Sequence, residues 1–307
     1  MKIPQKFRSS VSLTFFVSLL SIQLCFGWGK DGHRIINRVA IETLPADVPA
    51  FLRSARAIRE VEYLGPEPDR WRSEQDLNSA QAPEHFIDLE LVDMAFPRGL
   101  PERRFDFIHD LYAAQISHSG MAQQLIPQKV GLLPWQANEW FERMKVDMRE
   151  YRIRSAARVD RYGVEQAILY DAGVLGHYVG DGSQPLHTTI NYDGWMEQDN
   201  PEGFTRLRGV HGEFETAFVH DNIHASDVRT LIPIAPRVLD SPFQDFVAYL
   251  RMTHRQVAGV YRLQKRGGFE GRGSVQSRDF TAERLAAGAT MLRDMIYTAW
   301  VQSAQSE

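Results

Sequence analysis

Cysteine is nearly absent from this sequence. Cys25 is the only cysteine among the 307 residues, and it lies in an N-terminal stretch that has the pattern of a cleaved signal peptide. Removal of that stretch leaves a chain without a disulfide bond, although exported proteins meet oxidising conditions that allow disulfides. A mature chain of this length can rely on its hydrophobic core for stability instead.

The N-terminal stretch predicts export. It opens with three basic residues: Lys2, Lys6 and Arg8. An apolar run over residues 11–26 follows, and this run is short for a membrane span. Small residues occupy the −3 and −1 positions of a cut before Trp28: Cys25 and Gly27. We therefore predict a signal peptide over residues 1–27, a mature domain over residues 28–307, and a secreted or periplasmic location.

The sequence also lacks an excess of basic residues. It has 35 lysine and arginine residues against 39 acidic ones, a net charge of −4, and loss of the three basic residues of the signal changes this to −7. No basic block or arginine-rich stripe is present. These features disfavour a protein that wraps duplex nucleic acid. Any recognition of an anion must therefore come from a local site.

Strand-like alternation of apolar and polar residues is scarce, and apolar residues recur at helical spacing instead. Helices are predicted over residues 33–44, 101–118, 134–158, 164–179, 243–263 and 281–304. Loops are predicted over residues 65–83, 191–208 and 265–278. The sequence therefore predicts a single all-α domain, with the helix over 164–179 almost fully buried.

Histidines occur at a spacing that is typical of metal ligands. His177 and Asp181 are four residues apart, which places both on one helix face with their Cβ atoms about 6 Å apart. His211 and Glu215 repeat this spacing, and His187 stands between the two pairs. Together these residues form a nitrogen and oxygen ligand set without sulfur, which suits zinc.

A single pair of this kind carries little weight. A histidine four residues before a carboxylate most often marks a hydrogen bond on the surface or in the core. Here two pairs occur, with a histidine between them, and one pair lies at the end of the most apolar predicted helix. A buried carboxylate and a buried imidazole need partners, and a metal ion can serve both.

Four motifs together resemble one protein superfamily. They are Trp28-Gly-Lys-Asp-Gly-His33, His85-Phe-Ile-Asp88, His177-Tyr-Val-Gly-Asp181-Gly-Ser-Gln-Pro-Leu-His187 and His211-x3-Glu215. The superfamily contains the zinc-dependent single-strand nucleases of the S-one and P-one type and the bacterial zinc-dependent phospholipases C. The resemblance runs from Trp28 to about Val219 and implies the compact all-helical fold of that superfamily, with a metal cleft.

The resemblance implies three zinc ions in one cleft. By resemblance, the first zinc has four ligands: Asp69, His85, His177 and Asp181. The second has three: His187, His211 and Glu215. The third is held by the α-amino and carbonyl groups of Trp28 together with His33 and Asp181, so that Asp181 bridges two ions. The amine forms only when the signal peptide is removed, because an uncleaved chain has an amide there.

The resemblance also assigns residues to catalysis and substrate binding. Zinc can lower the pKa of bound water to about 7, which supplies a nucleophile for in-line attack on phosphorus. Asp69 is expected to orient the water, and Arg72 of the Asp69-Arg-Trp-Arg72 segment to contact the phosphate, with Arg70 as a competitor for that role. Phe86 is expected to stack on a base, with core packing as its alternative, and Asp88 to bind the edge of the base.

The sequence leaves the substrate open between two branches of the superfamily. Arg72, Phe86 and Asp88 favour an endonuclease that acts on single-stranded DNA or RNA. Glu215 stands where the nucleases usually have aspartate, and with the absence of disulfides it favours a phospholipase C that acts on phospholipid head groups. A secreted metal-binding protein without turnover is a further alternative. Nothing implies a stable protein partner, so a monomer is expected.

Overall fold

The computed structural model describes residues 28–304, and within this range it contains helices and two isolated β-bridges but no strand. The predicted signal peptide and its cut lie outside the described residues. The longer helices are α1 (Gly29–Glu42), α2 (Ala55–Leu64), α6 (Arg104–Ser117), α8 (Leu133–Ala157), α9 (Tyr162–Asp181), α13 (Pro242–His254), α14 (Val257–Lys265) and α15 (Val275–Gln302).

Short helical segments connect the longer helices. They are η1 (Ala50–Arg53), α3 (Glu67–Trp71), α4 (Gln75–Gln81), η2 (Ala82–His85), α5 (Leu89–Ala95), η3 (Ser119–Met121), α7 (Pro127–Val130), η4 (Pro185–His187), α10 (Val210–Gly212), η5 (Glu213–Ala217), α11 (Phe218–Asn222) and α12 (Ala225–Arg229). The η5 segment is a π-helical turn, and the other η segments are 3-10 turns.

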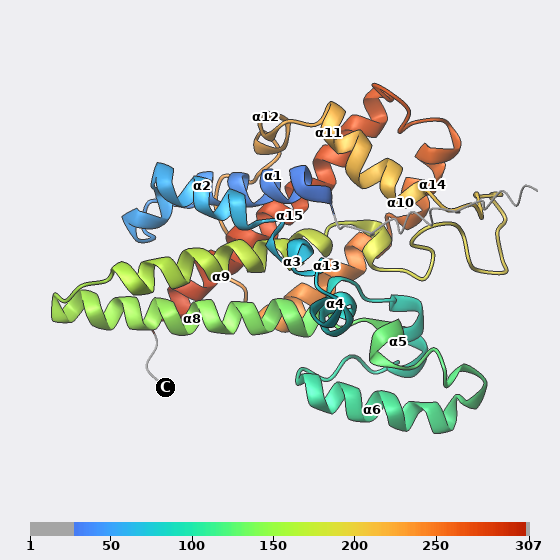
Figure 1. The fold of residues 1–307 in the computed structure, drawn as a ribbon, viewed down its shortest axis with the longest axis horizontal. Helices are drawn as coiled ribbons and strands as arrows, with labels where there is room; N and C mark the ends of the chain where they lie inside the picture. The colour runs from blue at the N-terminus through green and yellow to red at the C-terminus, as the bar shows by residue number, and fades with distance from the viewer. Residues whose placement is uncertain (1–27, 305–307) are drawn as a thin grey trace, which may run out of the picture.

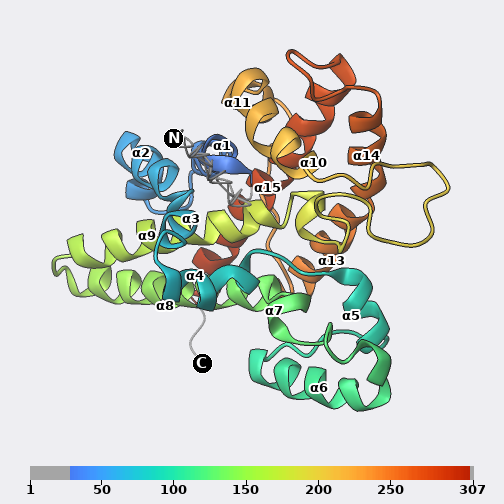
Figure 2. The ribbon, with the colours of Figure 1, turned by 45° about the vertical axis from the view of Figure 1, so that its right-hand side comes forward.

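Helix α9 lies at the centre of the fold, where it packs against α1, α2, α8 and α15 (Figure 1). Its residues from Asp171 to Asp181 are all buried, as the apolar sequence of this helix predicts. Helices α8 and α9 run side by side in both views of the ribbon (Figure 2). They are joined by a tight turn in which Arg158 has a φ of 57° and ends α8. Buried residues from α1 to α15 form one hydrophobic cluster.

Most predicted helices are confirmed within four residues at either end, namely α1, α6, α8 and α9. Helix α15 is confirmed too, but it begins six residues earlier than predicted, inside the predicted loop over residues 265–278. The prediction of one helix over residues 243–263 was wrong, because the chain forms α13 and α14 with a break at Arg255 and Gln256. The prediction of a loop over residues 65–83 was also wrong, since α3 and α4 lie there. The loop over residues 191–208 is confirmed as free of helix.

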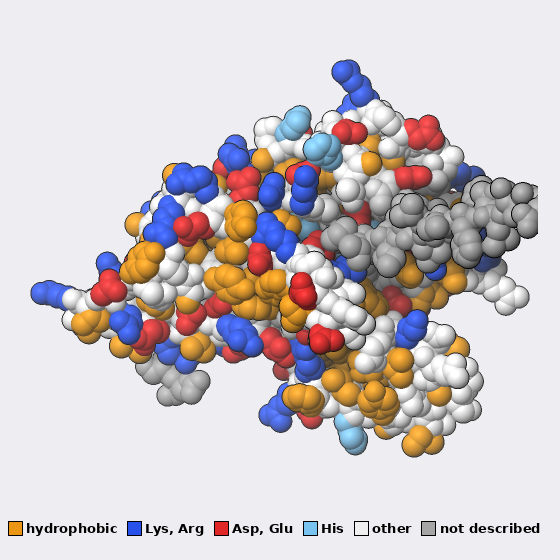
Figure 3. All heavy atoms as spheres, viewed as in Figure 1, with side chains coloured by type: hydrophobic (Ala, Val, Ile, Leu, Met, Phe, Trp, Pro, Cys, Tyr) orange, Lys and Arg blue, Asp and Glu red, His pale blue; other side chains and the backbone are white. Residues whose placement is uncertain are grey.

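The surface carries both signs of charge. On the face seen in Figure 3, lysine and arginine side chains alternate with acidic ones, and no large basic patch is visible. This agrees with the absence of a basic stripe in the sequence. Among the described residues, no helix combines the length and apolar character that a membrane span requires.

Candidate metal centre

Asp181, the last residue of α9, lies at the centre of a cluster of buried histidines. Its Oδ2 atom is 3.0 Å from Nδ1 of His85 and 3.3 Å from Nε2 of His177. Its Oδ1 atom is 3.5 Å from Nε2 of His33 and 3.6 Å from Nδ1 of His187. The two oxygens of one carboxylate thus face different histidines, His85 and His177 on one side and His33 on the other, which is the arrangement expected of a carboxylate that bridges two cations.

Helices α1 and α9 approach closely at this cluster. His177 and Asp181 are one turn apart on α9 and therefore share a face. Between them lies Gly180, where a Cβ atom would stand 2.9 Å from Nδ1 of His33. The absence of a side chain at this position lets the His33 ring stack on the ring of His177, with the ring centroids 4.0 Å apart.

An extended segment, residues 86–88, holds His85 next to His187. The backbone N–H of Ile87 donates to the carbonyl oxygen of His187 at 2.9 Å, and Nδ1 of His187 donates to the carbonyl oxygen of His85 at 2.6 Å. On its other side the segment pairs with Gly131, whose φ is 89°. A Cβ atom at Gly131 would lie 2.1 Å from the carbonyl oxygen of Phe86, so this position requires glycine.

His187, His211 and Glu215 form a group that could hold one metal ion, with their ligand atoms within 4.8 Å of one another. Nε2 of His211 is 2.6 Å from Oε2 of Glu215, and Nε2 of His187 is 3.8 Å from the same oxygen. The short helix α10 carries His211, and Glu215 follows in the π-helical turn η5. Such turns occur often at functional sites.

The proton positions in this group favour a cation. Nδ1 of His187 faces the carbonyl of His85, and Nδ1 of His211 faces the carbonyl of Tyr192 at 3.1 Å. Because a carbonyl only accepts, a neutral ring keeps its proton on Nδ1 and carries a lone pair on Nε2. The two Nε2 atoms are 3.2 Å apart, and burial lowers the pKa of His187 to about 4, so that this ring is neutral at neutral pH. A metal ion would stabilise these converging lone pairs.

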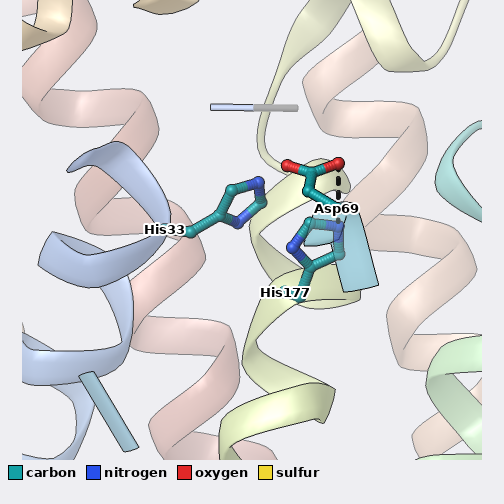
Figure 4. A group of neighbouring side chains, drawn as sticks. All are labelled: His33, Asp69 and His177. Carbon is teal, nitrogen blue, oxygen red and sulfur yellow. Dashed lines mark ion pairs between the residues drawn. The ribbon is translucent and has the colours of Figure 1, made fainter. Parts of the chain in front are cut away.

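Further groups of ligand atoms lie around His177. One consists of His85, His177 and Asp181, and another of His33, Asp69 and His177 (Figure 4). Oδ1 of Asp69 is 3.9 Å from Nε2 of His177. Nδ1 of His177 donates a hydrogen bond to the carbonyl oxygen of Gly65 at 2.9 Å. One histidine side chain thus takes part in two of the groups.

Several atoms of the cluster are buried and have no hydrogen-bond partner among the described residues. They are both ring nitrogens of His33, both carboxylate oxygens of Asp69, Nε2 of His85 and Oδ1 of Asp181. Burial of such atoms without a partner costs free energy, and this cost disappears when the atoms bind a cation. The residues of the cluster are therefore suitable ligands for metal ions that bind nitrogen and oxygen atoms.

The structure brings most of the predicted zinc ligands together. The set of His187, His211 and Glu215 lies together as predicted. In the set predicted for the first zinc, His85, His177 and Asp181 lie together, whereas Asp69 is grouped with His33 and His177 instead. His33 also lies near Asp181, with which the resemblance predicts that it shares a zinc ion.

Trp28, a predicted ligand through its backbone, lies at the start of α1. Its carbonyl oxygen accepts the N–H of Gly32 at 3.2 Å and keeps a second lone pair. Its indole N–H donates to Oγ of Ser183 at 2.6 Å, which anchors this end of the helix beside the cluster. The α-amine depends on a cut that lies outside the described residues, so this ligand stays a prediction.

Burial shifts the pKa values of carboxyl groups in the cluster in a direction that metal binding would reverse. It raises the pKa of Glu215 well above its ordinary value and also raises that of Asp69. Burial acts in the same direction on Asp181, but His177 and His187 outweigh it and hold the pKa of Asp181 well below its usual range. A bound cation requires ionised carboxylates, and would thus lower the raised pKa values.

A cavity of about 270 Å³ opens beside the cluster. Its walls include three candidate ligands and the three residues that are predicted to contact substrate: His85, His187, His211, Arg72, Phe86 and Asp88. The structure therefore brings these residues from four separate parts of the sequence to one small cavity.

Arg72 connects this cavity to the metal ligands. Its Nη1 atom is 3.6 Å from Oδ1 of Asp69. Arg70, its competitor for the phosphate, instead pairs with Glu67, lies over the ring of Tyr63 and lines a different cavity. Of the two arginines, Arg72 is therefore better placed to reach a phosphate at the cluster.

Three residues of the site were missed by the sequence reasoning. Nε2 of Gln184 donates to Oε2 of Glu215 at 3.0 Å and so orients a ligand. Its position inside the His177–His187 motif was a signal that could have found it. Lys129 and Tyr192 also line the cavity, but neither belongs to a motif, so the sequence held no comparable signal for them.

No family model matches this chain. Over 123 residues, 37% of the chain, it is 31% identical to a probable serine protease of Bradyrhizobium tropiciagri, and it spans only 14% of the length of that protein. Ser183, the serine inside the histidine motif, is buried, accepts a hydrogen bond from Trp28 and donates to the carbonyl of Gly180 at 2.8 Å. Those contacts do not resemble a serine nucleophile that is paired with a general base.

Proposed function

We propose that this protein is a secreted zinc-dependent phosphodiesterase of the phospholipase C / nuclease P-one superfamily, with single-stranded DNA or RNA as its substrate. The observation that carries the proposal is the convergence of buried ligand groups on Asp181, next to a cavity lined by Arg72, Phe86 and Asp88. The overall negative charge does not oppose it, because three zinc ions would supply a strong local positive field.

The histidine and carboxylate groups would hold zinc, which supplies Lewis acidity and an activated water at neutral pH. Asp69 has both oxygens buried without a hydrogen-bond partner in residues 28–304, which supports the proposal that it accepts a hydrogen bond from the attacking water. Arg72 lies beside it, and its guanidinium can neutralise charge that develops on the phosphate oxygens.

Phe86 supports the nuclease branch. It is partly exposed and lines the cavity, but it belongs neither to the hydrophobic core nor to the partly buried residues that pack against that core. Its position therefore favours contact with a ligand over core packing. Stacking of a base on such a ring contributes about 1–3 kcal/mol.

Asp88 lies on the same wall as Phe86 and has an unusual acidity. Burial, with Glu90 nearby, raises the pKa of its carboxyl to about 8. At neutral pH the Asp88 carboxyl is therefore protonated in most molecules, and in that form it can donate one hydrogen bond and accept others. Such a group can pair with the donor and acceptor edge of a base.

Metal analysis and a substrate panel test the proposal. The mature protein should hold at least two tightly bound zinc ions, and it should hydrolyse single-stranded DNA and RNA in a reaction that chelator abolishes. Fewer than two zinc ions per chain, or no turnover of any phosphodiester by the zinc-loaded protein, would overturn it.

Glu215 supports a second candidate, a zinc-dependent phospholipase C, because this branch has glutamate at the corresponding position. The cavity of about 270 Å³ also fits one phospholipid head group. The variant Phe86→Ala separates the candidates. Loss of the ring should impair hydrolysis of nucleic acid about 5- to 150-fold through lost stacking, and phosphatidylcholine hydrolysis much less. Equal losses on both substrates would argue for a packing role.

A further inference from the structure

A second cavity, of about 760 Å³, continues from the cavity beside the metal ligands. The two cavities share Asp88, Lys129 and Tyr192 in their walls. The second one extends between residues 119–124, which follow α6, and the loop of residues 190–208. Together the cavities form one groove, with the candidate metal centre at its inner end and Arg208 at its outer part.

Arg208 is a cation without a partner in the protein. It is exposed and forms no ion pair or hydrogen bond with any residue of the described range 28–304. Lys129 is also exposed, at the junction of the two cavities. The carboxylate of Asp193 in the same groove already accepts the backbone N–H groups of Gly209 at 2.7 Å and His211 at 3.2 Å. Within residues 28–304 it forms no ion pair with Arg208 or Lys129, so these cations remain available to an anion.

An aromatic ring stands at the same junction. Tyr192 is 43% exposed, which is high for a large side chain that lines a cavity, and its ring centroid is 6.2 Å from that of His211. Exposed rings beside cations are the features that bind single strands, because bases stack on the ring and phosphates pair with the cations.

We propose that this groove binds the nucleotide next to the scissile phosphate of a single strand, with Arg208 at its phosphate and Tyr192 under its base. This inference rests on the proposed function and extends it, since it makes the protein prefer strands of several nucleotides over small phosphodiesters. The metal cavity alone would accommodate the small ones.

Binding of a strand that resists hydrolysis tests the role of Arg208. The affinity of the zinc-loaded protein for a fluorescent phosphorothioate oligonucleotide is measured by anisotropy over a range of salt concentrations. Each phosphate contact contributes about 0.7 to the slope of log affinity against log salt. Arg208→Ala should therefore lower the slope by about 0.7 and Arg208→Lys should retain it. Arg255→Ala, at an exposed arginine outside both cavities, should leave it unchanged.

Turnover separates this inference from the proposed function. Arg208→Ala should reduce kcat/KM for an ordinary oligonucleotide about tenfold at low salt, while hydrolysis of bis(p-nitrophenyl) phosphate stays at the wild-type rate. Equal losses on both substrates, or an unchanged salt slope, would overturn the role of the groove. If the wild type binds the strand with the expected slope but hydrolyses neither substrate, the groove stands and the phosphodiesterase fails.

Tyr192 provides an independent measurement. Tyr192→Ala should weaken binding of the strand about 5- to 150-fold, because one stacked base is lost, and Tyr192→Phe should restore it. Failure of phenylalanine to restore binding would contradict stacking. Phosphatidylcholine vesicles serve as the other probe: binding of vesicles that depends on Arg208 and Tyr192, without binding of the strand, would show that the groove takes lipid and would overturn the proposal.

Discussion

Two of the candidate metal groups differ in how firmly the protein holds them. In the group of His187, His211 and Glu215, both histidines have Nδ1 fixed by a carbonyl oxygen and the glutamate accepts a hydrogen bond from Gln184. In the group of His33, Asp69 and His177, neither ring nitrogen of His33 and neither oxygen of Asp69 has a hydrogen-bond partner within residues 28–304.

The difference indicates that the fold orients the first group, whereas His33 and Asp69 of the second group depend on a ligand for their partners. Fixed imidazoles bind metal with little reorganisation, because hydrogen bonds already select their tautomer and direction. The atoms around His33 instead gain their partners when a cation arrives. His33 of the second group is also predicted to share a zinc ion with Trp28 and Asp181, and signal removal is predicted to complete that ligand set.

The largest effect is expected from Asp181→Asn, because Asp181 faces histidines of more than one group. The amide keeps the shape but loses the charge, so bound metal should fall by about two ions and turnover by about 10³-fold or more, beyond the 10- to 100-fold effect of a residue that only orients a ligand. Metal analysis and single-strand hydrolysis check this. Normal turnover in the variant would exclude a bridging role.

Metal removal should destabilise the protein, and more so as the pH rises. Protons compete with metal for Glu215 and Asp69, whose pKa values burial raises. In the metal-free protein such groups contribute stability that is complete below their unfolded pKa and is lost as the pH rises through their folded pKa. Zinc at about 1,000 times its Kd adds about 4 kcal/mol. The difference in Tm with and without zinc, measured from pH 5 to pH 8, should therefore increase. A constant difference would contradict the assignment.

Gln184→Ala should weaken the well-oriented group alone. Loss of the hydrogen bond to Glu215 should reduce metal affinity and activity about 10- to 100-fold, with the ions of the other groups retained. Gln136→Ala is a matched control, because Gln136 is also buried but accepts its hydrogen bond from Arg104. Equal loss of metal in Gln184→Ala and Gln136→Ala would mean that the substitutions act by destabilising the protein as a whole, and not through the ligand Glu215.

The smallest effect is expected on stability, from a buried carboxyl group that lies away from the cluster, that of Asp171. Burial and the neighbouring Asp147 raise the pKa of Asp171 to about 8. Its contribution to stability is therefore complete below its ordinary pKa near 3.8 and is lost as the pH rises through about 8. Asp171→Asn should stabilise the protein by roughly 1–3 kcal/mol at pH 8 and by almost nothing at pH 4. Thermal unfolding of the variant and the wild type at pH 4 and pH 8 measures this change in stability. An equal change at the two pH values would refute the raised pKa of Asp171.

The sequence predicted the helices whose apolar spacing agrees with their burial. Helix α9 is the strongest case, because its apolar sequence matches a helix that is surrounded by others. The break between α13 and α14 carries no glycine or proline, so no local signal marked it. Helix α3 follows Gly65 and Pro66, which are typical of loops, yet proline is also common at the first turn of a helix.

The candidate site was predictable where ligands are close in sequence. The spacing of His177, Asp181 and His187 and of His211 and Glu215 located most of the cluster. The carbonyl oxygens that fix the histidine rings carry no residue signature, because any residue supplies one. The second part of the groove depends on how the loop of residues 190–208 lies against residues 119–124, and tertiary contacts decide that arrangement.

The π-helical turn of residues 213–217 makes the length of this segment matter as much as its composition. A turn of this kind holds one more residue than an α-helical turn. Deletion of a single residue such as Phe214 would rotate the chain that follows by about 100° about the helix axis, and would change the spacing of His211 and Glu215 from four residues to three, which displaces the carboxylate relative to Nε2 of His211. Tolerance to insertion and deletion should therefore be lowest here, and a scan of single-residue deletions would map the ligand-bearing turn without any change of a ligand.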